Sequence, residues 1–380
     1  METREQNVDQ KMKELGSLDE RIAMMLRQRF ALAEEISREK IAAGDKVFDR
    51  SAEAEQITHL SSEGYGEFEQ AALKELFTQI QSIGRKKQYQ LLREYGAAGR
   101  LPFIMVDDID KKDVRVVFQG VEGAYSHAAM CTYFGNDVQS FHVDSFADAM
   151  EAIADGEADY AVLPIENSEA GIVGDSYDLL NNYENYIVAE QNIHIDHVLM
   201  GVPGTGLNEI ETVFSHPQAL AQCKAYLDEH RSWEQVRYAN TAMAARKVAE
   251  EGIRTHAAIG SRFAAERFGL EVLAENICYN DANTTRFIIV TNQRVFRKDA
   301  DKVSISFELP NTSGALYHIL AHFIYNNVNM YRIESRPIPG RNWQYRFFID
   351  FDGNLNESRV KNTIRGIRSE AIGMQILGNY

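Results

Sequence analysis

The sequence predicts a multidomain protein, with an all-α domain first, an α/β domain in two lobes second and a ferredoxin-like βαββαβ domain last. Apolar residues recur at helical spacing near the start, and no Pro or Gly interrupts residues 17–43. Farther along, strands alternate with helices, and the last segment runs strand, helix, strand, strand, helix, strand. We therefore expect domains at 1–100, 113–295 and 300–380.

The first domain is expected to consist of two long helices and a short one. Leu18, Ile22 and Ile36 belong to the apolar stripe of the first helix. A short helix near 49–63 and a long one over 67–95 follow. Three such helices are too few to bury their own apolar faces. We therefore expect pairing with a second copy of the chain, as a homodimer or a dimer of dimers.

Charge and cysteine content limit the partners and the compartment. The net charge of −16 argues against a nucleic-acid or anionic-membrane surface. The N-terminus is charged without an apolar core, unlike a signal peptide, and no apolar run approaches the length of a membrane span. Cys131, Cys223 and Cys278 form neither a disulfide framework nor a CxxC pattern. We expect a cytoplasmic protein.

The middle domain repeats one pattern, in which a strand ends, a Ser, Thr or Asn follows, and a helix begins. The pattern occurs at Tyr125-Ser126, Ser145, Ser215, Asn240-Thr241 and Ser261. Each position also suits an ordinary helix N-cap. Strand ends of an open α/β sheet nevertheless gather at one crevice, where helix N-termini present free N–H groups. Their convergence predicts a crevice for a doubly anionic ligand.

Polar side chains also stand where two buried strands begin or end. One strand opens with a turn that carries two threonines and an arginine, and another closes with an acid and an amide. Ser215 and Gln222 are seven residues apart and share a helix face. The candidates are Glu166, Asn167, Ser215, Gln222, Thr285, Arg286 and Phe287. A ligand site and a solvated turn both fit these residues taken alone.

Several of these segments resemble one enzyme family. GVEGAYSHAA (120–129), PIENS (164–168), SHPQALAQC (215–223) and TRF (285–287) resemble prephenate dehydratase. The last domain, with GAL (314–316) and ESRP (334–337), resembles an ACT regulatory domain. The first segment resembles an AroQ-type chorismate mutase. The chain thus resembles the bifunctional chorismate mutase–prephenate dehydratase family, whose dehydratase domain has a periplasmic-binding-protein-like fold.

The resemblance implies conversion of prephenate to phenylpyruvate, carbon dioxide and water in phenylalanine biosynthesis, without a metal or organic cofactor. It implies that Thr285, Arg286 and Glu166 are catalytic, with Thr285 as the proton donor or its hydrogen-bonding partner. Arg286 has the geometry to hold a carboxylate bidentately. Implied prephenate-binding residues are Ser126, Asn167, Ser215, Gln222 and Phe287. Implied residues for phenylalanine as effector are Gly314, Ala315, Leu316, Glu334, Ser335 and Arg336.

The first domain departs from the family at three positions. Implied chorismate-binding residues are Arg29, Lys40, Asp49, Glu53 and Gln88. Arg29 and Lys40 lie on the apolar stripe, roughly 16 Å apart, although snorkelling to the helix edge would also explain them. Met12 and Ala52 replace arginines, and Gly84 replaces a serine. We expect a slow mutase, or a domain retained for dimerisation.

Two alternatives stay open. His194-Ile195-Asp196-His197 contains metal-ligand types, but His194 and Asp196 would share one strand face while His197 points away. A metal site is therefore disfavoured. The chain is also compatible with a non-enzymatic sensor of amino acids, built from an α/β binding domain and an ACT module. The segment 285–287 beside Glu166 favours the enzyme.

Overall fold

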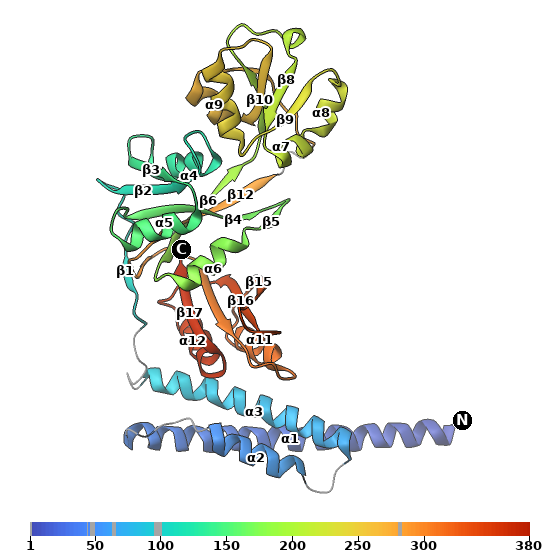
Figure 1. Cartoon of the computed structure of the whole chain (residues 1–380). Coiled ribbons are helices and arrows are strands. Elements are labelled where there is room, and N and C mark those ends of the chain that lie inside the picture. The colour runs from blue at the N-terminus through green and yellow to red at the C-terminus, as the bar shows by residue number, and fades with distance from the viewer. Residues whose placement is uncertain (1, 44, 46–49, 63–65, 95–100, 280–282) are drawn as a thin grey trace. The chain divides into compact units, whose positions relative to one another are not determined.

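The computed structural model describes residues 2–43, 45, 50–62, 66–94, 101–279 and 283–380 (Figure 1). The chain divides into two compact units. Unit 1 contains residues 1–101, 314–328 and 358–370, and unit 2 contains residues 102–313, 329–357 and 371–380. Among the described residues, no helix combines the length and the apolar character needed to cross a membrane.

Unit 1 is helical, which confirms the predicted helical N-terminal domain. Its helices are α1 (Glu2–Ala43), α2 (Arg50–Ser62), α3 (Glu67–Glu94), α11 (Ala315–Tyr325) and α12 (Ser358–Glu370). The apolar stripe of α1 is largely uncovered, with exposed fractions of 47% to 62% for Val8, Met12, Leu15, Leu18, Ile22, Met25, Leu32 and Ile36. A stripe of this length in water is unusual for a monomer.

Unit 2 holds two lobes, as predicted. The first is built on β2 (Arg115–Gln119), β3 (Gln139–Val143), β4 (Tyr160–Asn167), β5 (Gly171–Ile172), β6 (Tyr186–His194) and β12 (Thr284–Thr291). Its helices are α4 (Tyr125–Phe134), α5 (Phe146–Ala154) and α6 (Gly174–Asn182). The strands lie in the order β6-β12-β4-β2-β3, with β5 against β4. Val117, Leu163 and Ile288 form part of one core.

The second lobe has a five-stranded sheet in the order β11-β7-β10-β8-β9. Its strands are β7 (His197–Gly201), β8 (Thr212–Ser215), β9 (Glu234–Arg237), β10 (His256–Ser261) and β11 (Glu271–Ala274). Its helices are the 3-10 turn Leu207–Glu209, α7 (Pro217–Gln222), α8 (Lys224–Glu229), α9 (Thr241–Glu251) and α10 (Arg262–Phe268). The chain passes between the lobes twice, from β6 to β7 and from β11 to β12 (Figure 1).

The C-terminal strands continue the sheet of the first lobe. They are β14 (Lys302–Glu308), β15 (Met330–Pro337), β16 (Tyr345–Asp352) and β17 (Ile372–Asn379), in the order β15-β16-β14-β17. With α11 and α12 they confirm the predicted βαββαβ order. Strand β17 meets β6 where Gly378 pairs with Ile187, and a side chain at Gly378 would collide with the Ile187 carbonyl. The short strands β1 (Ile104–Val106) and β13 (Val295–Arg297) pair separately.

Candidate active site

A cavity of about 430 Å³ opens between the two lobes of unit 2. Its wall includes residues that begin helices: Tyr125 opens α4, Phe146 opens α5, and Thr241 opens α9. Asn240 caps α9 with its side chain, and Val173 precedes α6. Helix N-termini present unpaired N–H groups and a partial positive charge. The cavity therefore suits anionic groups, although no Lys or Arg is among the described residues that line it.

Strand β12 brings Thr285 to this cavity, beside two asparagines. The antiparallel register pairs Thr285 with Asn167 of β4, and both line the cavity. The Asn167 amide donates to Thr285 Oγ1 over 2.9 Å and to Asn283 Oδ1 over 2.8 Å. Because Thr285 Oγ1 accepts from Asn167, its own O–H is directed elsewhere. Thr285 is only 9% exposed, so this hydroxyl is a sheltered donor at the cavity wall.

A second chain of hydrogen bonds lines the cavity around His197. Tyr125 Oη lies 3.0 Å from His197 Nδ1, and His197 Nε2 lies 3.1 Å from Gln222 Oε1. The Gln222 amide donates in turn to Glu169 over 2.7 Å. Gln222 Oε1 must accept, so the proton of neutral His197 sits on Nε2 and Tyr125 donates to Nδ1. Gln222 is thereby held in one orientation.

The role of His197 was missed in the sequence, where it was weighed only as a metal ligand. Its signal is its position as the first residue of a buried strand that begins at the crossing between lobes. Burial is the main cause that lowers the pKa of His197, although the bond to Gln222 opposes it. The folded protein thus favours the neutral ring.

The lowered pKa of His197 predicts a pH dependence of the unfolding free energy, which the substitution His197→Gln should remove. A His with a folded pKa below its unfolded value contributes stability that is present above the unfolded pKa and is lost as pH falls toward the folded pKa. Between about pH 7.5 and pH 5.5, the parent protein should therefore lose more unfolding free energy than His197→Gln. Urea unfolding of both proteins across this range measures the difference. Parallel pH profiles would contradict the neutral assignment.

Arg286 and Glu166, expected in the site, do not line the cavity. Arg286 Nη2 lies 3.2 Å from Glu166 Oε2 and 3.1 Å from Asp350 Oδ2, and its Nη1 lies 3.2 Å from Glu190. Glu166 also accepts from Arg332 over 2.8 Å. The reason is strand geometry, since successive side chains point to opposite faces. Arg286 and Thr285 therefore lie on opposite faces of β12.

Three further expected residues are buried and lie outside the cavity lining. The Ser215 hydroxyl is fully buried and donates to the Ile259 carbonyl over 2.6 Å. Phe287 packs in the core of the first lobe, and Ser126 is buried in the first turn of α4. Among the predicted prephenate-site residues, the structure therefore brings Thr285, Asn167 and Gln222 to the cavity, and places Arg286, Glu166, Ser215, Phe287 and Ser126 outside its lining.

Unit 1 gathers some of the expected chorismate-binding residues. Glu53 accepts from Arg85 over 2.5 Å, and burial raises the pKa of Glu53 while Arg85 and Arg29 oppose that effect. A Cβ at Gly84 would lie 4.0 Å from Arg29 Nη1. Lys40 and Gln88 are half-buried, whereas Asp49 lies outside the described residues.

Arg85 was missed in the sequence. It lies three residues before Gln88, on the same face of α3. Its guanidinium also pairs with Glu370 of α12 over 2.8 Å. The local sequence around Arg85 does not predict this contact.

The expected phenylalanine-binding residues occupy both units. In unit 1, Gly314 has φ of +78° and precedes α11, whose first turn contains Ala315 and Leu316. This left-handed conformation favours glycine. In unit 2, Glu334, Ser335 and Arg336 lie on β15. Arg336 Nη2 pairs with Asp178 Oδ2 of α6 over 2.6 Å, so its guanidinium is already engaged.

Fold and cavity together define a class of protein: a two-lobed α/β enzyme for a small anionic substrate, joined to a helical unit. Residues 116–295 match the family model for prephenate dehydratase, and residues 12–89 match chorismate mutase type II. The chain belongs to the bifunctional chorismate mutase/prephenate dehydratase family. It is a prephenate dehydratase with an N-terminal chorismate mutase domain, as the resemblance implied.

Full-length relatives share this organisation. The bifunctional chorismate mutase/prephenate dehydratase of Stutzerimonas stutzeri is 32% identical over 96% of this chain and 95% of its own length. That of Escherichia coli (strain K12) is 30% identical over 96% and 94%. The prephenate dehydratase of Arthrobacter aurescens, solved in complex with L-Phe, is 35% identical, with a TM-score of 0.65 over 70% of this chain and 89% of that one.

Proposed function

We propose that Thr285 delivers the proton that lets the C4 hydroxyl of prephenate leave. The single observation that carries this assignment is the bond from Asn167 to Thr285 Oγ1, which leaves the threonine O–H free to donate into the cavity. Threonine is a very weak acid. The Asn167 N–H offsets part of this by stabilising negative charge that develops on Oγ1 during transfer.

The proposed step balances without a cofactor. The electrons of the bond to the ring carboxylate form the new ring double bond, and carbon dioxide leaves. The C4–O bond gives its electrons to the departing oxygen, which takes the proton and leaves as water. Solvent returns a proton to Thr285. The remaining carboxylate of the substrate is held by helix N-termini at the cavity wall rather than by an arginine, because Arg286 is engaged elsewhere.

The activity is tested by mixing purified protein with prephenate and following phenylpyruvate by its ultraviolet absorbance. Enzymatic formation well above the uncatalysed rate supports the assignment. Product at the uncatalysed rate only would favour the alternative of a non-enzymatic amino-acid sensor, which uses the same cavity for binding alone. The sheltered Thr285 donor beside Asn167 and Asn283 favours catalysis, since binding alone does not require it.

We further propose that phenylalanine inhibits the dehydratase through the C-terminal domain. The support is the Arthrobacter aurescens prephenate dehydratase solved with L-Phe, together with the motifs at 314–316 and 334–337. The first of these motifs begins at a glycine in a left-handed conformation just before α11. Inhibition at a distance requires two states that bind phenylalanine with different affinity.

Gly314→Val is expected to abolish the response to phenylalanine. Valine is strained at a φ of +78° and adds bulk where the motif begins. Phenylalanine at a hundredfold excess over its Kd should stabilise the parent protein by about 2.7 kcal/mol and lower its turnover. Thermal unfolding and phenylpyruvate formation, each with and without phenylalanine, measure both effects. A parent protein that phenylalanine neither stabilises nor inhibits would refute the sensor role of this domain.

We propose that the mutase domain is slow because its site lacks positive charge. Met12 is 62% exposed on α1 and Ala52 is exposed on α2, where the family carries arginines. Each missing charge-assisted hydrogen bond is worth roughly 1.5–3 kcal/mol. Arg85 supplies a cation, but Glu53 and Glu370 already neutralise it.

Met12→Arg combined with Ala52→Arg is therefore expected to raise chorismate turnover by about tenfold or more, the equivalent of at least one such bond. Chorismate consumption, followed by ultraviolet absorbance, measures the gain. Met12→Lys with Ala52→Lys is the matched control, since lysine adds charge without the bidentate fork. A parent protein that already converts chorismate as fast as prephenate would show that the departures do not matter.

A second copy of the chain is the occupant we propose for the uncovered stripe of α1, either in a homodimer or in a dimer of dimers. The support is the row of half-exposed apolar side chains from Val8 to Ile36.

We also propose functional domains at 1–100, 113–295 and 300–380, although β17 joins the sheet of the first lobe. The cytoplasm remains the proposed compartment, and Cys131, Cys223 and Cys278 are free thiols.

A further inference from the structure

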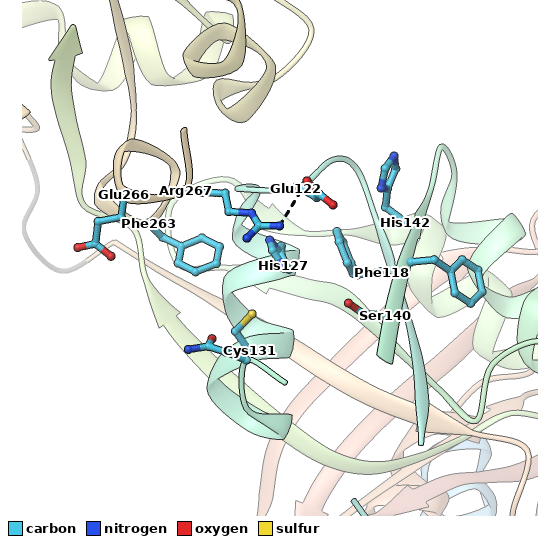
Figure 2. Close-up of a pocket in the computed structure, with 11 residues that line it drawn as sticks. Phe118, Glu122, His127, Cys131, Ser140, His142, Phe263, Glu266 and Arg267 are labelled. Atoms are coloured by element: carbon cyan, nitrogen blue, oxygen red, sulfur yellow. Dashed lines mark ion pairs between the residues drawn. The ribbon is translucent and has the colours of Figure 1, made fainter. Parts of the chain in front are cut away.

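A second cavity, of about 420 Å³, lies on the other side of α4 (Figure 2). It is lined by β2, β3 and α4 of the first lobe and by α10 of the second. Tyr125 lines the active-site cavity and His127 lines this one, because residues two apart point to nearly opposite sides of a helix. The two cavities share no lining residue. The dehydratase reaction therefore leaves this cavity unexplained.

The wall of this cavity contains a hydrogen-bond donor from a largely buried side chain. His127 is only 7% exposed, and its Nδ1 accepts the N–H of Gly123 over 3.0 Å. The proton of the neutral ring therefore sits on Nε2. Within the part of the chain that the structure describes, no group accepts that proton. Because His127 lines the cavity, its Nε2–H can donate to a ligand or to water there.

His127 is held neutral and rigid. Its ring stacks on Phe118 with centroids 4.8 Å apart and meets Phe263 edge-on at 5.1 Å. Burial lowers the pKa of His127, and the positive charge of Arg267 acts in the same direction. The donor is therefore preorganised by packing, and its geometry does not depend on a ligand for support.

The cavity lining carries both positive and negative side chains, and this combination indicates which kind of ligand would bind. Arg267 and Glu122 face each other with their charged groups 3.6 Å apart, and each is about half exposed (Figure 2). Glu266 lies farther along the wall. A simple anion would meet two carboxylates, and a simple cation would meet Arg267. A zwitterion matches both signs, with its carboxylate on Arg267 and the His127 N–H and its ammonium on Glu122.

The remaining wall combines polar side chains, Asn136, Ser140 and His142, with aromatic ones. Phe263 of α10 and Phe141 of β3 line the cavity, and Phe141 is 36% exposed. The volume falls in the range of roughly 300–1,000 Å³ typical of small-ligand sites. We propose that this cavity binds an α-amino acid with a large apolar or aromatic side chain, at a site separate from the active site and from the C-terminal domain. The proposal does not rest on the proposed dehydratase mechanism.

Cys131 gives a local readout of occupancy. This free thiol lines the cavity and is partly exposed, and burial raises its pKa. Iodoacetamide at about pH 8.5, near the ordinary thiol pKa, should alkylate it slowly, and peptide mass spectrometry reports the rate. L-phenylalanine or L-tryptophan at ten times its Kd should slow this reaction about tenfold, because only the unliganded fraction reacts. Cys278, which is partly exposed and lies outside the cavity, serves as an internal reference, whereas Cys223 is fully buried.

Analogues and variants test the recognition chemistry on the full chain. 3-Phenylpropionate lacks the ammonium and phenethylamine lacks the carboxylate, so neither should protect Cys131. Arg267→Gln and Glu122→Gln should each abolish protection, and both positions are exposed enough to tolerate the change. Arg246→Gln, which breaks an exposed ion pair with Glu250 away from the cavity, should retain it.

Three results would overturn the proposal. Equal alkylation of Cys131 with and without both amino acids would show that the cavity does not bind them. Protection by 3-phenylpropionate as strong as that by phenylalanine would exclude recognition of a zwitterion. The third result is protection that persists in both Arg267→Gln and Glu122→Gln. It would mean that phenylalanine acts from the C-terminal domain alone. That outcome contradicts the proposal without affecting the dehydratase assignment.

Discussion

Thr285→Val is expected to lower kcat for prephenate by roughly 10²- to 10⁴-fold, the range typical of removing a general acid. Valine keeps the shape of threonine but offers neither a proton to the leaving hydroxyl nor an acceptor for Asn167. KM should change little, since a proton donor acts mostly in the transition state. Steady-state formation of phenylpyruvate measures both constants.

Two variants on the same strand make this test specific. Thr285→Ser retains a hydroxyl beside Asn167 and should keep much of the activity. Thr284→Val makes the same chemical change one residue earlier, on the opposite strand face, and should have a small effect. Near-normal kcat for Thr285→Val would remove this residue from the mechanism. A raised KM at constant kcat would make it a binding residue instead.

Local patterns were sufficient to predict the order of the elements. The unbroken helical spacing between residues 17 and 43 lies within the single helix α1. The Ser, Thr and Asn residues between strands and helices are indeed caps at Ser145, Asn240 and Ser261, whose side chains accept from backbone N–H groups. These features depend on neighbours in sequence, so the sequence alone contains the information.

Contacts between distant segments could not be predicted in the same way. Sequence reasoning placed Thr285 and Arg286 in one site, although adjacent strand residues face opposite sides. It gave no reason to join β17 to β6 at Gly378, or to bring Arg85 to Glu370 across 285 positions. The hydrogen bonds of His197 likewise depend on the crossing between lobes, which sets residues 125 and 222 beside it.

The placement of Arg286 leads to the second large effect. Its side chain is 14% exposed and faces Glu166, Glu190 and Asp350. Burial alone would lower the pKa of Arg286, but the surrounding acidic groups, Asp350 and Glu190 among them, raise it. The guanidinium thus neutralises carboxylates contributed by β4, β6 and β16, which come from both the dehydratase segment and the C-terminal strands.

Arg286→Met is therefore expected to destabilise the protein by about 3–5 kcal/mol, because it leaves the buried carboxylate of Asp350 without its counter-charge, whereas Glu166 and Glu190 keep Arg332 and Lys302. Urea unfolding measures the loss. Arg294→Met is the matched control: it breaks an exposed ion pair with Glu184 on the same stretch of chain and should alter stability by at most about 1 kcal/mol. The opposite outcome is equally clear. If stability were unchanged and the KM for prephenate were raised, Arg286 would be the residue that holds the substrate carboxylate. Its side chain would then have to leave Glu166 to reach the cavity.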